Sequence, residues 1–299
     1  MRSFYGENKR KSYFEGWYLK HQSETESVAF IPAYHVDRSG RRSASLQIIT
    51  ETQSYHCDFP IEAFHACSGH FCVRLGNSLF AERGCRLNLS TDSLSVRGVL
   101  RYGPLLPPAP DIMGPFRFVP FLQCRHSVLS LTHQVTGTLH INGRKYTFPS
   151  GTGYIEGDRG TSFPKRYLWT QCCWMDKTPC SLMLSVADVP FYGTRFTGCI
   201  CSIYFHGKEY RLATYHGVKL LRVGERSVFL QQGDAFLEAE LVDGSGQPLR
   251  APEHGGMDRT VYESTLCRMH YRFSVHRTVL FDFVSDNASF EYSSSEKIQ

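Results

Sequence analysis

A carboxylate flanked by aromatic side chains stands near the N-terminus. Residues 13–18 are typical of a β-strand, and strand alternation places Tyr13, Glu15 and Trp17 on one face. If that face is turned towards a cavity, Glu15 loses hydration, its pKa rises, and it can serve as a proton donor. For this segment taken alone, an exposed Glu15 beside a core Trp17 is the favoured alternative.

A second group of acids follows in the middle of the chain. Tyr154, Glu156 and Asp158 share a face if their segment is a strand. Two acids at this spacing can share a proton, whereas Arg159 or Arg166 can hold either of them in a structural ion pair. Taken alone, the structural ion pair is favoured.

Three further residues could orient a polar group or line a pocket. Trp169 and Gln171 share a face of a predicted strand at 167–174, and His126 opens another at 126–132. A histidine can donate a proton near neutral pH, although a lone histidine is more often a satisfied core residue.

The elements that must position these residues are strands. Strand-like runs separated by turn residues recur along the chain, and the best helical candidate is the short segment 60–66. Asn142-Gly143 between two alternating runs predicts a hairpin over 137–148. The pattern predicts an all-β protein built from barrels or sandwiches.

The length of 299 residues suits two domains. If the hairpin at 137–148 is the last element of one barrel, the strand-like segment after Gly151 is the first element of a second barrel. We therefore expect domains at 1–150 and 151–299.

Composition narrows the function classes. The chain is 41% hydrophobic and 20% charged, and its net charge of +5 is spread without a basic block, so we expect no nucleic-acid partner. No apolar run reaches the roughly 18 residues of a membrane span, while the apolar segment from Leu105 to Phe121 is compatible with peripheral membrane contact.

The sequence has no phosphate loop or dinucleotide fingerprint, and we expect no cofactor. It carries no signal for an oligomeric state.

Eleven cysteines raise the question of metals and disulfides. No Cys-x-x-Cys occurs, and the adjacent Cys172 and Cys173 would point to opposite faces of a strand. The odd number and the lack of a signal-type N-terminus predict reduced thiols, no metal site and a cytoplasmic location.

Several motifs together resemble the tocopherol cyclase family, in family order along nearly the whole chain. They are Phe14-Glu15-Gly16-Trp17-Tyr18, Gly114-Pro115-Phe116-Arg117-Phe118-Val119-Pro120-Phe121, Cys124 to Leu131, Gly153 to Pro164, Trp169-Thr170-Gln171 and Met257 to Ser264.

The resemblance implies a pair of lipocalin-like β-barrel domains and cofactor-free closure of a chromanol ring on a prenylated hydroquinone, a lipophilic small molecule. That reaction needs an acid to protonate an alkene, aromatic faces to stabilise the cation, and exclusion of water. Residues at matching motif positions are the acids Asp158, Glu156 and Glu15, with Asp158 the first choice of proton donor. The matching substrate-binding residues are Trp17, His126, Tyr154, Trp169, Gln171 and Arg259.

The chain departs from the family pattern at three positions. Gly157 and Arg159 stand where family members typically have Lys and Trp, and Cys173 stands where they usually have Asn. The leading hypothesis is a cyclase or isomerase for an isoprenoid substrate. The alternatives are a non-catalytic carrier of a lipophilic ligand and an alkene hydratase of the same architecture.

Overall fold

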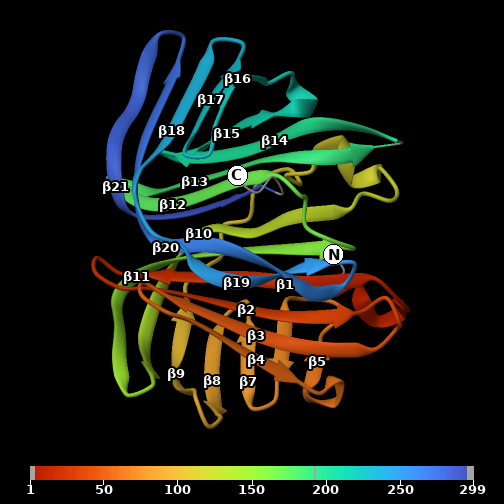
Figure 1. Cartoon of the computed structure of the whole chain (residues 1–299). Coiled ribbons are helices and arrows are strands. Elements are labelled where there is room, and N and C mark those ends of the chain that lie inside the picture. The colour runs from red at the N-terminus through yellow and green to blue at the C-terminus, as the bar shows by residue number, and fades with distance from the viewer. Residues whose placement is uncertain (1–3, 192, 295–299) are drawn as a thin grey trace. The chain divides into compact units, whose positions relative to one another are not determined.

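The computed structural model describes residues 4–191 and 193–294 and is almost entirely β-structure (Figure 1). Strands make up 69% and helices 5% of it, in two large sheets. The all-β prediction is therefore confirmed. The helices are short 3-10 turns: η1 (Gly6–Asn8), η2 (Ile61–Ala63), η3 (Gly114–Phe118) and η4 (Thr214–His216). Among the described residues, no helix is long and apolar enough to cross a membrane.

The first sheet has eleven antiparallel strands in the order β4-β3-β2-β1-β11-β10-β9-β8-β7-β6-β5. Its two edge strands, β4 and β5, are joined through η2, so the chain folds the sheet towards closure. The strands are β1 (Tyr13–Gln22), β2 (Ser27–Val36), β3 (Arg42–Thr50), β4 (Ser54–Phe59), β5 (Phe64–Ala66), β6 (Cys72–Leu75), β7 (Ser78–Ala81), β8 (Gly84–Ser90), β9 (Ser95–Tyr102), β10 (Cys124–Ile141) and β11 (Arg144–Gly160).

The second sheet follows the order β15-β14-β13-β12-β21-β20-β18-β17-β16, and β19 pairs with β20. Its strands are β12 (Tyr167–Asp176), β13 (Thr178–Phe191), β14 (Thr194–Phe205), β15 (Lys208–Ala213), β16 (Lys219–Val223), β17 (Ser227–Gln232), β18 (Ala235–Asp243), β19 (Gln247–Glu253), β20 (Gly256–Val275) and β21 (Thr278–Ser293).

The described chain forms two compact units, each with its own hydrophobic core. Unit 1 contains residues 4–107, 124–163 and 249–259, and unit 2 contains the rest. The expected boundary between Ser150 and Gly151 lies inside β11, which continues to pair with β1 and β10 as far as Gly160.

Two local predictions can be compared with the structure. The hairpin is confirmed, because Asn142 and Gly143 connect β10 to β11 with positive φ angles of 48° and 82°, as a tight hairpin turn requires. The helical candidate at 60–66 is only the single 3-10 turn Ile61–Ala63, after which the chain enters β5. Three residues of helix followed by extended backbone leave no room for an α-helical turn.

Candidate active site

The central pair of strands in unit 1, β1 and β11, divides the candidate acids between two faces. Glu15 pairs with Arg159 and Trp17 with Gly157, whereas Gly16 pairs with Asp158. Directly paired residues project to the same face of a sheet, and neighbours along a strand project to opposite faces. Glu15 therefore lies on one face and Asp158 on the other.

The same register identifies the two faces. Trp17 and Leu19 belong to the hydrophobic core of unit 1, together with Ile155, which pairs with Leu19. Their face is the interior of the barrel-like sheet, and it carries Glu15. Glu156 and Asp158 are on the opposite face of the sheet.

On that opposite face, His126 lies between two carboxylates. Strand β10 places His126 directly opposite Asp158, and its Nδ1 is 2.9 Å from Asp158 Oδ1. Its Nε2 is 3.2 Å from Glu156 Oε2, without the alignment of a hydrogen bond. Tyr154 donates its hydroxyl hydrogen to the same Glu156 oxygen over 2.5 Å. We call His126, Glu156 and Asp158 the acid–base cluster.

Burial and the neighbouring charges have opposite effects on the pKa of His126. Burial lowers its pKa, but the charges of Asp158 and Glu156 and the hydrogen bond to Asp158 outweigh burial, so the pKa is raised well above its usual value. The side chains of His126, Glu156 and Asp158 are 13%, 7% and 21% exposed. The cluster therefore holds an imidazolium between two acids, with Asp158 as its most accessible member.

This arrangement can give and take protons at neighbouring positions. An imidazolium beside Asp158 stabilises the carboxylate that remains after proton transfer, while Glu156 can accept a proton from a second group. The three side chains also present ligand atoms within 4.8 Å of one another and could hold a divalent ion. Cys124 donates its thiol hydrogen to Asp158 Oδ1 at 3.5 Å, a contact that sequence analysis missed because it depends on the β10–β11 register.

Glu15 is a second candidate acid, and it is buried. It is 4% exposed, and one of its oxygens accepts hydrogen bonds from the Tyr13 hydroxyl at 2.8 Å and the Tyr5 amide at 2.9 Å. Burial raises its pKa, although these hydrogen bonds and the charge of Arg159 oppose the rise. The favoured sequence interpretation, an exposed Glu15, is therefore wrong.

Aromatic rings crowd the interior next to Glu15. The Trp17 ring lies 5.9 Å from that of Phe71 and 6.4 Å from that of Phe4. Gly157 makes room for Trp17, because a Cβ at position 157 would lie 3.2 Å from Trp17 Cδ1. A lysine, as in the family pattern, would require Trp17 to move.

Arg159 is directed to an aromatic ring. Its guanidinium carbon lies 4.1 Å from the centre of the Tyr5 ring, a cation–π contact. The structural alternative for Arg159, a pair with Glu156 or Asp158, does not fit its register, since Arg159 is on the face of Glu15.

Trp169 and Gln171 belong to β12 in unit 2, and both are buried. The Gln171 amide nitrogen donates to Cys173 Sγ at 3.0 Å, while its amide oxygen has no hydrogen-bond partner among the described residues. A buried acceptor without a donor is costly, so this oxygen is suited to a hydroxyl of a ligand. Arg259 is half-buried in the first part of β20, within unit 1.

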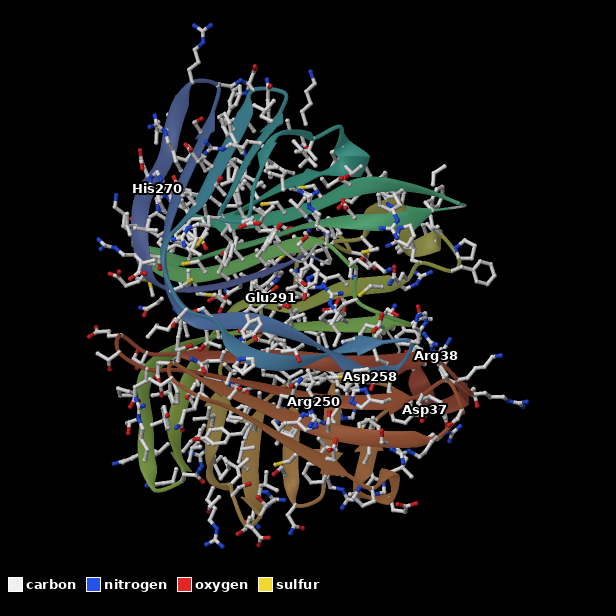
Figure 2. All side chains as sticks on the ribbon, in the orientation of Figure 1. Asp37, Arg38, Arg250, Asp258, His270 and Glu291 are labelled. Carbon is white, nitrogen blue, oxygen red and sulfur yellow. The ribbon has the colours of Figure 1, made fainter. Side chains whose placement is uncertain are left out.

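A polar hollow of about 450 Å³ lies elsewhere in unit 1. Asp37, Arg38 and Asp258, labelled in Figure 2, are among its lining residues, with Ser39, Glu253, His254 and Gly256. Its charged lining does not match the lipophilic substrate expected from the sequence.

The sequence matches a family model described as tocopherol cyclase-like over residues 93–293. The chain belongs to the tocopherol cyclase-like family. This membership supports a catalytic role of the cyclase type. None of the curated protein sequences matches the chain.

Solved structures show that the fold is shared at low sequence identity. CghA in complex with Sch210972 has a TM-score of 0.60 and 13% identity over 95% of this chain and 89% of its own. Kievitone hydratase from Nectria haematococca has a TM-score of 0.52 and 14% identity over 94% and 89%. At these identities the likeness concerns the fold, and the predicted lipocalin-like double-barrel class is confirmed.

Membership of the tocopherol cyclase-like family bears differently on the two candidate acids. The matched residues 93–293 include the whole acid–base cluster, whereas Glu15 and Trp17 precede them. The cluster therefore lies in the part of the chain on which the family assignment rests.

Proposed function

We propose that this protein is a cofactor-independent cyclase that closes a ring on a prenylated hydroquinone or a similar isoprenoid substrate. The observation that carries the proposal is the position of one imidazole, His126, between the carboxyl groups of Asp158 and Glu156. Membership of the tocopherol cyclase-like family supports the reaction class.

In the proposed reaction, Asp158 takes the proton that it shares with His126 and donates it to a trisubstituted alkene, which leaves a tertiary carbocation. The phenol oxygen of the same substrate captures the cation, and its proton passes to Glu156. His126 lies within 3.2 Å of Glu156 and 2.9 Å of Asp158, so it can return that proton and restore the starting state. Substrate and product are isomers, and no redox step occurs.

The remaining residues have supporting roles in this proposal. Tyr154, on the face of Asp158, supplies an aromatic face for the cation, whereas Trp17 on the opposite face would serve a cation formed beside Glu15. Arg259, in the same unit as the cluster, binds the polar end of the substrate. The lipid-borne substrate is consistent with a cytoplasmic protein that contacts a membrane peripherally.

Glu15 is the alternative proton donor, and the raised pKa of this buried carboxyl favours it. A carboxylic acid with a raised pKa, beside aromatic rings, meets two requirements of alkene protonation. The variants Glu15→Gln and Asp158→Asn separate the two donors, because only loss of the true donor abolishes turnover.

Incubation with a prenylated hydroquinone, followed by chromatography and mass spectrometry, tests the function. Conversion to a product of unchanged mass and altered retention is the expected result. A product that has gained one water would instead establish an alkene hydratase. Saturable binding with full recovery of unchanged substrate would establish a carrier protein and overturn the proposal.

A further inference from the structure

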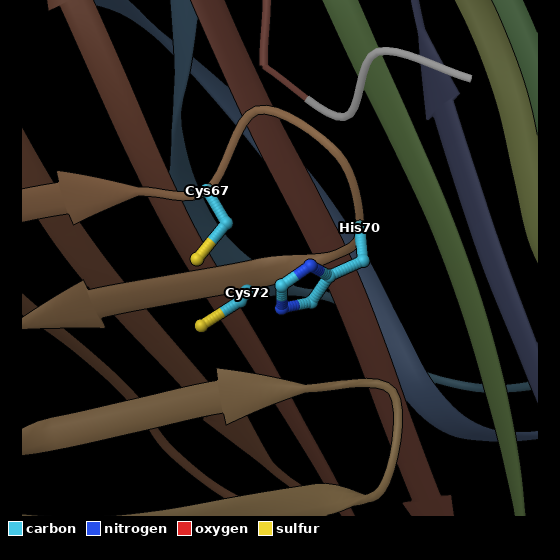
Figure 3. Close-up of side chains that lie close together, drawn as sticks. All are labelled: Cys67, His70 and Cys72. Carbon is cyan, nitrogen blue, oxygen red and sulfur yellow. The ribbon is translucent and has the colours of Figure 1, made fainter.

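Two cysteines and a histidine meet at the turn between β5 and β6. Figure 3 shows the Cys67 and Cys72 thiols side by side, with the His70 imidazole next to Cys72. The Cys67 amide donates to the Cys72 carbonyl at 3.0 Å, which extends the β5–β6 ladder and holds the cysteines opposite one another. The two sulfur atoms and an imidazole nitrogen all lie within 4.8 Å of one another.

These donors match the preference of a thiophilic divalent ion. Zinc binds thiolate sulfur at about 2.3 Å and imidazole nitrogen at about 2.0 Å, so ligand atoms around a tetrahedral ion are about 3.5 Å apart. The ligand atoms, which lie within 4.8 Å of one another, would have to approach by at most about 1.3 Å. Gly69 lies in the same turn, where a Cβ would meet no atom within 4 Å, so the turn has space to adjust.

We propose that Cys67, His70 and Cys72 form a binding site for a single Zn²⁺-like ion, with the fourth position open to water. The spacing Cys-x-x-His-x-Cys differs from the paired Cys-x-x-Cys pattern considered in the sequence. The register of the β5–β6 hairpin nevertheless places the two cysteines opposite one another. The site is separate from the acid–base cluster of β10 and β11.

The ion would fix a turn that reaches the barrel interior. Phe71, between His70 and Cys72, is buried and packs on Trp17, with ring centres 5.9 Å apart. Since β5 has only three residues and lies at the edge of its sheet, a bound ion would add a cross-link where strand pairing is short. We therefore expect zinc to raise the unfolding temperature.

Cobalt titration of the full chain under a phosphine reductant tests this site. The wild-type protein should bind one equivalent of Co²⁺ with thiolate-to-cobalt charge transfer and strong tetrahedral d–d bands, and Zn²⁺ should displace it. Cys67→Ser and Cys72→Ser should lose the charge-transfer signal. His70→Ala, at an exposed position, should keep its fold and show weaker binding with altered d–d bands.

Cys57→Ser is the matched control, because Cys57 is also half-buried in unit 1 and lies outside the three-residue cluster. It should bind cobalt as the wild-type protein does. Absence of a charge-transfer band in the folded wild-type protein would overturn the proposal. Equal loss of the band in Cys57→Ser, or its full retention in Cys67→Ser and Cys72→Ser, would also overturn it.

Discussion

Replacement of Asp158 by Asn removes one of the two charges that face His126. At about 3 Å and an effective dielectric constant near 20, the lost attraction is about 5.5 kcal/mol before compensation. Glu156 stays 3.2 Å from the ring, and the Asn oxygen can still accept the Nδ1 hydrogen, so most of that value is recovered. We expect a net loss of about 2 kcal/mol in the free energy of unfolding, the value of one charge-assisted hydrogen bond.

The same substitution should change the pH dependence of stability. The pKa of His126 is raised in the folded state, so its stabilising contribution is complete below the unfolded value of about 6.5 and is lost as pH rises through the folded pKa. Asp158→Asn removes a main cause of that rise. Urea unfolding at several pH values should therefore show a shallower fall in stability above neutral pH for the variant.

Turnover should respond more strongly than stability. Removal of a proton-transfer group costs typically about 100-fold or more in rate, so Asp158→Asn should lose nearly all product formation while it remains folded. Asp282→Asn is the matched control, since Asp282 pairs with the ring of His270 (labelled in Figure 2) at 2.7 Å but at an exposed position. Wild-type turnover by folded Asp158→Asn would refute the proposed role of the cluster.

Three further variants test other parts of the structure. Glu15→Gln should become more stable relative to the wild type as pH rises above the ordinary Glu range. The reason is that the buried carboxyl of the wild type has a raised pKa, so its ionisation costs folding free energy. A pH-independent loss of stability in urea unfolding would contradict this. Gly157→Ala should destabilise by about 1–3 kcal/mol and shift the near-ultraviolet circular dichroism of Trp17, and an unchanged spectrum would count against their close packing. A double replacement of Phe118 and Phe121 by Ser should reduce sedimentation with liposomes, since these side chains are 74% and 96% exposed; undiminished sedimentation would exclude this loop as the contact.

Strand alternation was sufficient to predict much of the fold and part of the site. It placed Glu15 with Trp17, and Glu156 with Asp158, because the period of two within one strand is readable from residue types. It could not relate the two strands to each other. Only the pairing of Gly16 with Asp158 shows that Glu15 and Asp158 lie on opposite faces.

The contacts of the acids with His126 and Arg159 could not be predicted either, because they also depend on the pairing register between strands. His126 is 32 residues from Asp158, and nothing in its neighbours along the chain distinguishes it from a core histidine. The β10–β11 register places His126 opposite Asp158, and the neighbouring carboxylates raise the pKa of His126. Arg159 likewise follows Asp158 in sequence, yet strand alternation turns it to the opposite face, where it contacts Tyr5.

The most direct test of the central claim is turnover of a prenylated hydroquinone in deuterium oxide, with mass spectrometry of the product. Protonation of an alkene by the acid–base cluster adds one carbon-bound deuterium that does not wash out in ordinary water. The proposed mechanism predicts this single deuterium in the cyclised product of the wild-type protein and no product from Asp158→Asn. A cyclised product without deuterium, or the labelled product from both proteins, would contradict it.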